Sequence, residues 1–144
     1  MRKIALDIGT ISCGIAISDP YNMFASSLET IYAKPMNFEI LKKNLLHILK
    51  CFQVDTIIVG YPKKMNGNKS ETTFLIEEYY YLLKNNFSQK IILVDERQST
   101  KQAREIMRQG NLTRKKQKNF KDSLAAQIIL ERYLQGGDEI ELNQ

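Results

Sequence analysis

Several residue types that build metal or redox sites are scarce in this chain of 144 residues. It has no tryptophan, one histidine and two cysteines. Cys13 and Cys51 form no C-x-x-C motif, and they make no metal-ligand set with His47. We therefore expect two free thiols in a reducing cytoplasm, acting as packing residues, and a solvated histidine.

Long apolar runs are also missing. No stretch approaches the roughly 20 residues that a membrane helix needs. The start, Met1-Arg2-Lys3, does not lead into a signal-peptide core, because Asp7 interrupts the apolar stretch. We predict a cytoplasmic protein with no membrane partner. The length suits one domain, expected over residues 1–138, with an acidic tail at 139–144.

Positive charge is abundant and unevenly distributed. The net charge is +5, and the window 101–121 holds eight basic residues against one acid, Glu105. Such a cluster favours a polyanionic partner, because each phosphate contact releases counterions. The alternative is an ordinary solvated helix surface.

Hydrophobic periodicity predicts an α/β protein with one mixed sheet. Three strands joined by short connections come first, and helices then alternate with two further strands. This order predicts three antiparallel strands followed by parallel strands, five in all, with helices on both faces, as in the ribonuclease H-like fold. The expected strands are 3–8, 14–18, 24–33, 55–62 and 90–96, and the expected helices are 38–52, 71–86, 99–110 and 116–134.

Asp7 stands in the middle of the first apolar strand, where a carboxylate costs several kcal/mol unless a cation meets it. Because side chains alternate along a strand, Asp7 shares a face with Ala5 and Gly9. Ile4, Leu6 and Ile8 point the other way. Small neighbours leave room for an ion or a backbone to approach the carboxylate.

A second acid, Glu96, follows the apolar strand ending near Val94, at the edge where ligands gather in open α/β sheets. Asp95, next to it, points to the opposite side if the strand continues. The alternative is that these acids begin a loop and pair with Arg97.

A third acid, Asp122, heads an apolar stripe on the last helix, and the stripe should face the sheet. The alternative is an acid favoured by the helix dipole, or a partner for nearby lysines. The stripe is formed by Ala125, Ala126, Ile129 and Tyr133.

Three such acids on three separate elements suit hard, oxygen-loving cations, Mg²⁺ or Mn²⁺. Two such ions, about 4 Å apart, can activate a water and stabilise the leaving oxygen of a phosphodiester. We predict that Asp7, Glu96 and Asp122 are metal ligands and catalytic residues, beside a basic window that holds the nucleic-acid backbone.

Four segments in order resemble the YqgF (RuvX) family. They are "ALDIGT…GIAISDP", "IIVGYPKKMNG", "LVDERQST" and "RKKQKNFKDSLAAQIIL". The resemblance implies a ribonuclease H-like fold and a nuclease that matures the 5′ end of pre-16S rRNA during ribosome biogenesis. It also implies structured RNA as the partner, with branched DNA as the alternative for a Holliday junction resolvase-like enzyme.

The family's acidic positions fall on Asp7, Glu96 and Asp122. Arg97 and Thr100 match polar positions that could contact a phosphate, pair within the loop or cap a helix. Between Thr10 and Gly14, the segment "ISC" departs from the family's basic residues. Ser12 or backbone amides would have to replace a phosphate contact there. The basic helix start that the resemblance assigns to nucleic-acid binding comprises Arg114, Lys115, Lys116 and Lys118.

Two other classes of function compete. "DIGT" also resembles the phosphate-binding hairpin of actin-like ATPases, but those proteins need two such lobes. A non-catalytic RNA-binding module is the other alternative, since acids in place do not prove turnover. We expect a monomer or a weak homodimer, because no long exposed apolar stripe remains for a large interface.

Overall fold

A computed structural model describes residues 1–62, 70–95, 114–137 and 139–142, with the backbone alone over 114–123. Its centre is a single mixed sheet with the strand order β3-β2-β1-β4-β5-β6. The strands β1 to β3 are antiparallel neighbours, whereas β4 and β5 run parallel to β1. The bounds are β1 Arg2–Ile8, β2 Ser12–Ser18, β3 Ala25–Tyr32, β4 Val54–Tyr61, β5 Lys90–Asp95 and β6 Glu139–Ile140.

The predicted mixed sheet is confirmed, but the predicted number of five strands is wrong. The sixth strand, β6, pairs antiparallel with Leu93 and Val94 on the outer edge of β5. It lies in the segment 139–144, which the sequence analysis expected to be an acidic tail. A strand of two residues has no periodicity to detect, so pairing with the sheet is what defines it.

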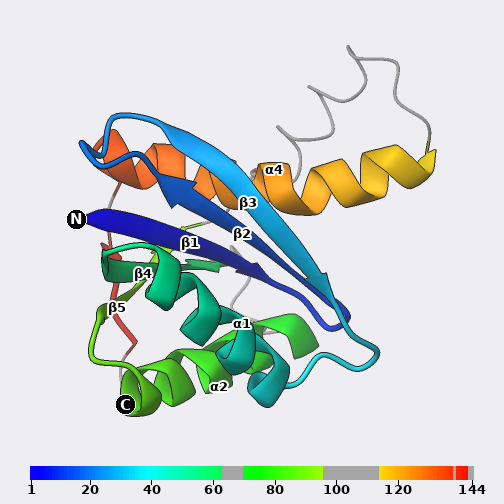
Figure 1. Ribbon diagram of the computed structural model, residues 1–144. Coiled ribbons are helices and arrows are strands. Elements are labelled where there is room, and N and C mark those ends of the chain that lie inside the picture. Colours follow the sequence, from blue (N-terminus) through cyan, green and yellow to red (C-terminus); the bar gives the residue numbers. More distant parts are fainter. Residues whose placement is uncertain (63–69, 96–113, 138, 143–144) are drawn as a thin grey trace.

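Helices cover both faces of the sheet, as predicted (Figure 1). The helices α1 (Phe38–Cys51) and α2 (Glu71–Asn86) lie on one face, and α4 (Arg114–Leu134) crosses the other. The Asn37 side chain accepts a hydrogen bond from the backbone N–H of Ile40 at 3.1 Å, which caps the start of α1. The helix predicted at 99–110 lies outside the described residues. No helix in the described ranges is long and apolar enough to span a membrane.

Alternation along β1 divides the core into two layers. Ile4, Leu6 and Ile8 are buried in the layer under α1 and α2. Ala5 points the other way and is fully buried in the layer under α4, together with Ala126. The strands β1 to β3 contribute only alanines to the buried residues of this layer, namely Ala5, Ala16 and Ala25, so the helix can lie close to them.

The helix α4 ends at Leu134, as predicted, and it ends in a Schellman motif. Gly136 has a φ of 97°, and the N–H of Gly137 donates to the carbonyl of Arg132 at 2.8 Å. A Cβ on Gly137 would lie 2.8 Å from the same Arg132 oxygen. These two glycines end the helix and turn the chain toward β6.

The close approach of α4 to the sheet predicts the effect of enlarging Ala126. Ala126→Leu should destabilise the protein by about 1–3 kcal/mol, because the added atoms overpack a fully buried position. Urea unfolding measures the change. Lys43→Leu, on the exposed side of α1, is the control and should change stability by less than about 0.5 kcal/mol. Equal effects at the two sites would contradict this packing.

Candidate active site

Asp7 is the described residue around which the candidate site is built. It is the half-buried next-to-last residue of β1, at the carboxyl end of a central strand. Ala5, two residues earlier, belongs to the α4 layer, whereas Leu6 and Ile8 belong to the opposite layer. The predicted face of Asp7 is therefore confirmed: its carboxylate lies on the side of the sheet that α4 covers.

A glycine lies on each side of Asp7 in the sheet. Gly14 on β2 is its direct antiparallel partner. On β4, Val59 is aligned with Leu6, so the next residue, Gly60, is level with Asp7. Residues that are level on neighbouring strands point to the same face, and glycine places no side chain there. Neither neighbouring strand therefore contributes a side chain beside the carboxylate, and an oxygen-only donor of this kind fits Mg²⁺ or Mn²⁺.

The position of α4 relates Asp122 to Asp7. Ala126 and Ala5 share one buried layer, and α4 runs opposite to β1 (Figure 1). From Ala126, four residues back along the helix cover about 6 Å. From Ala5, two residues forward along the strand cover about 6.6 Å. The two steps run in the same direction in space, so the helix backbone at Asp122 lies toward the carboxyl end of β1.

The stripe predicted below Asp122 is confirmed. Ala125, Ala126 and Ile129 are buried, and Tyr133 packs against the same layer. The side chain of Asp122 itself is not among those described.

Glu96 lies just outside the described residues, directly after β5. Ile92 and Val94 point into the α4 layer, whereas Ile91 and Leu93 point into the opposite layer. The sequence analysis expected Asp95 to point to the opposite side from Glu96 if the strand continued, and this alternation groups Asp95 with Ile91 and Leu93. Asp95 is paired with Tyr61 and has the opposite parity. Within the described residues, no group of three metal-ligating side chains occurs, so the convergence of the three acids stays a prediction.

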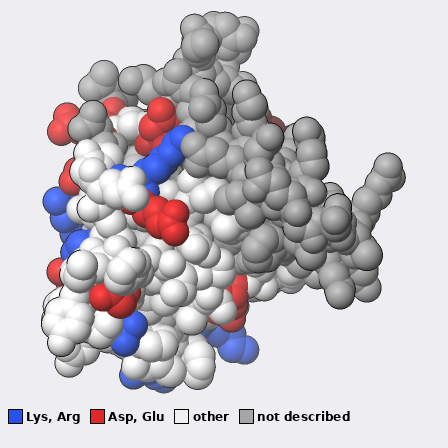
Figure 2. All heavy atoms as spheres, turned by 90° about the horizontal axis from the view of Figure 1, so that it is seen from above, with Lys and Arg blue, Asp and Glu red and all other residues white. Residues whose placement is uncertain are grey.

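The predicted nucleic-acid contacts fall largely outside the described part of the chain. Arg97 and Thr100 lie outside it. The backbone of Arg114, Lys115, Lys116 and Lys118 forms the start of α4, which has no acid in its first turn. Figure 2 shows that, on the described surface seen from above, acidic and basic side chains are interspersed.

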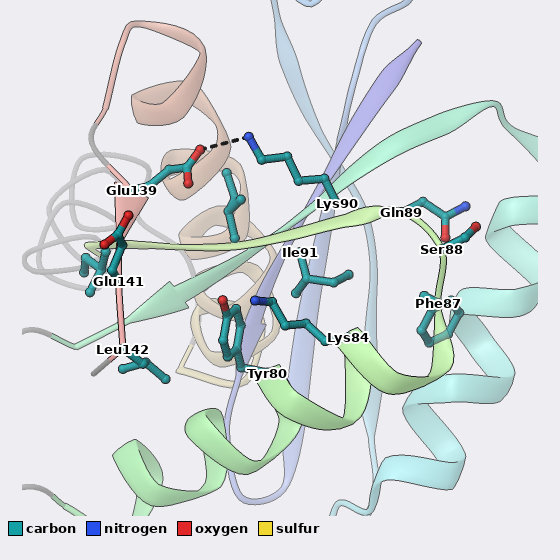
Figure 3. Close-up of a pocket in the computed structure, with 12 residues that line it drawn as sticks. Tyr80, Lys84, Phe87, Ser88, Gln89, Lys90, Ile91, Glu139, Glu141 and Leu142 are labelled. Atoms are coloured by element: carbon teal, nitrogen blue, oxygen red, sulfur yellow. Dashed lines mark hydrogen bonds and ion pairs between the residues drawn. The ribbon is translucent and has the colours of Figure 1, made fainter. Parts of the chain in front are cut away.

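Two cavities lie near the outer edge of the sheet. One, of about 480 Å³, lies between the end of β5 and the end of α4, and Asp95, Arg132 and Tyr133 are among its lining residues. The other, of about 680 Å³, lies between α2 and the β5–β6 edge (Figure 3). At its rim, the Lys90 ammonium pairs with Glu139 at 3.2 Å. The larger cavity includes Tyr80 from the layer opposite Asp7, so it is separate from the candidate site.

Sequence comparison relates almost the whole chain to one family. The model of a family described as RuvX, Holliday junction resolvase, matches residues 1–136. A protein of Mycoplasmopsis pulmonis named "Putative pre-16S rRNA nuclease" is 48% identical, covering 93% of this chain and 92% of its own. A protein of Mycoplasma capricolum with the same name is 46% identical over 92% and 94% of the two chains.

Solved structures agree on the fold at low identity. RuvC of Thermus thermophilus in complex with a Holliday junction substrate superposes with a TM-score of 0.58 at 14% identity, covering 97% of this chain and 99% of that one. The same protein in a second structure has a TM-score of 0.54 at 12% identity, over 97% and 100% of the two chains. This likeness confirms the ribonuclease H-like fold.

The glycines beside Asp7 lead to a prediction that sequence motifs alone did not give. Gly14→Ala places a methyl group next to the carboxylate, so Mn²⁺ binding should weaken and cleavage should fall by roughly 10²-fold. Calorimetric Mn²⁺ titration and a cleavage assay measure the two effects. Thr30→Val is the control, because Thr30 is level with Gly14 on the next strand and valine adds no bulk. A folded Gly14→Ala protein with unchanged Mn²⁺ binding would show that the bound cation does not lie next to Gly14.

Proposed function

Because the chain belongs to the RuvX family, we propose that it is a metal-dependent nuclease that hydrolyses a phosphodiester bond during 5′-end maturation of pre-16S rRNA. The observation that carries the proposal is the environment of Asp7. A half-buried carboxylate lies between two glycines, on the face crossed by the helix that bears Asp122. A carboxylate in this position, at the carboxyl end of a central strand, is suited to hold a divalent cation.

In this proposal, Asp7, Glu96 and Asp122 hold the divalent cations, Mg²⁺ or Mn²⁺. The bound ions would supply an activated water and charge stabilisation of the leaving oxygen. The protein places one acid at the end of β1, one after β5 and one on α4. Since Asp7 and Asp122 belong to separately packed elements, the site depends on how rigidly α4 lies on the sheet.

The start of α4 supports a polyanionic substrate. Four basic residues follow one another closely at the amino end of the helix, where the helix dipole is also positive. Positive side chains at this end are unfavourable unless an anion lies nearby. We assign the start of α4, together with Arg97 and Thr100, to contact with the phosphate backbone. The basic residues concerned are Arg114, Lys115, Lys116 and Lys118.

A second candidate activity is the resolution of DNA junctions, and the description of the matching family favours it. The chemistry at the three acids would be the same. The names of the two relatives favour the RNA substrate instead. A non-catalytic RNA-binding module with the same basic helix is the third alternative.

The substrate is decided by offering both nucleic acids to the same preparation. We expect a pre-16S 5′-leader RNA to be cut in the presence of Mn²⁺ or Mg²⁺, and a four-way DNA junction to stay intact. Chelation of the metal should abolish cleavage while RNA binding persists. Gel analysis of end-labelled substrates separates the outcomes. Cutting of the junction alone would establish a resolvase, and binding without any cutting would establish the RNA-binding module.

The role of Asp7 in catalysis is tested by removing its charge. Asp7→Asn should lower cleavage by roughly 10²-fold or more, because a neutral amide holds the cation weakly. RNA affinity in the presence of chelator should stay within about twofold. Asp55→Asn is the matched control, since Asp55 is an exposed acid paired with Lys3 at 2.9 Å. If both variants retained full activity, Asp7 would not be a catalytic ligand.

A further inference from the structure

The tight turn between β1 and β2 begins two residues beyond Asp7 and comprises residues 9–11, none of which is charged. It is closed by a hydrogen bond from the N–H of Gly9 to the carbonyl of Ser12 at 2.8 Å. Its tip residue, Ile11, is 39% exposed. An approaching phosphate would therefore find no cationic side chain on the turn itself.

The segment that follows β3 wraps around this turn. The N–H of Ala33 donates to the carbonyl of Ile11 at 3.0 Å, and the N–H of Met36 donates to the carbonyl of Thr10 at 2.9 Å. Met36 is buried in the layer under α1 and α2, so the segment is anchored in the core. Two backbone hydrogen bonds and one buried side chain thus fix the segment 33–36 against the turn.

Lys34 lies between these two hydrogen bonds and is exposed. Within the described part of the chain it makes no ion pair. The fold therefore brings a cation, distant in sequence from Asp7, to the end of the sheet where Asp7 lies. Nothing in the described core requires a lysine at this position, because its backbone neighbours provide the anchoring.

Tyr32 places an aromatic ring on the same segment. It is the last residue of β3, is aligned with Ser12 on β2 and is 47% exposed. Ser12 and Gly14 are two residues apart, and Gly14 is the partner of Asp7. By strand alternation, Tyr32 therefore lies on the Asp7 face. An exposed ring and an exposed cation on one short segment are a combination that single-stranded nucleic acids bind, through base stacking and phosphate contact.

We infer that the segment Tyr32–Lys34 holds the RNA strand next to the bond that is cut, with Lys34 on a phosphate and Tyr32 under a base. The inference rests on the proposed nuclease function and adds a substrate contact on the β3 side of Asp7. In the proposed function, the start of α4 contacts the phosphate backbone from a separate element. Two contacts on separate elements would fix the direction in which the strand crosses Asp7.

The test compares Lys34→Gln with Lys43→Gln, an exposed lysine on α1 that serves as the matched control. Binding of single-stranded 5′-leader RNA is measured at several salt concentrations in the presence of chelator. Lys34→Gln should weaken binding severalfold and reduce the slope of log K against log salt by about 0.7, the value for one lost phosphate contact. Lys43→Gln should leave the slope unchanged. Tyr32→Leu should weaken binding and leave the slope unchanged, because stacking releases no counterions.

A double variant, in which the positive charge is moved from Lys34 to the turn, tests the same inference. Adding Ile11→Lys to the Lys34→Gln protein places a cation on the turn that Lys34 adjoins, and RNA affinity should recover. Equal effects of Lys34→Gln and Lys43→Gln would overturn the inference, whether or not the protein cuts RNA. In contrast, a Lys34-specific loss of binding in a protein that cuts nothing would refute the nuclease proposal and leave the binding segment in place.

Discussion

The contact between α4 and the sheet through alanine side chains is the constraint on which the candidate site depends. Ala5 and Ala16 are directly paired on β1 and β2, and both are fully buried against the helix that carries Ala126. Small side chains on both surfaces allow the helix backbone to approach the strands closely. The acid one turn before Ala126 and the acid two residues after Ala5 are thereby held at the same end of the molecule. A bulkier layer would separate them by moving the whole helix.

Local sequence pattern predicted the elements and the face of Asp7, because alternation along a strand is a property of the strand alone. The stripe of Ala125, Ala126 and Ile129 was predictable because helical spacing is likewise a property of the local sequence. Features that depend on pairing between distant segments could not be predicted from the sequence. Gly60 lies within the strand predicted at 55–62, but its position level with Asp7 follows only from the pairing of β1 with β4. The strand β6 and the hydrogen bonds of Ala33 and Met36 to the first turn also arise only when remote segments meet.

Basic residues lie on two sides of the candidate site. Basic residues gather at the start of α4, on one side of Asp7, and Lys34 lies beyond the β1–β2 turn on the other. On the described part of the face that Figure 2 shows, acidic and basic side chains are interspersed. A strand of nucleic acid that contacts both groups would pass over the carboxyl end of β1, where the proposed cations neutralise the acids. The apparent conflict between acidic ligands and an anionic substrate is thereby removed.

The central claim, that three acids from separate elements form one metal centre, is tested most directly by Mn²⁺ titration of four single variants. Calorimetry on Asp7→Asn, Glu96→Gln and Asp122→Asn should show metal affinity reduced by roughly tenfold or more in each. Asp95→Asn should bind Mn²⁺ like the unmodified protein, because Asp95 has the opposite parity on β5. If Asp122→Asn bound Mn²⁺ as tightly as the unmodified protein, α4 would not supply a ligand, and the account of the site would be wrong.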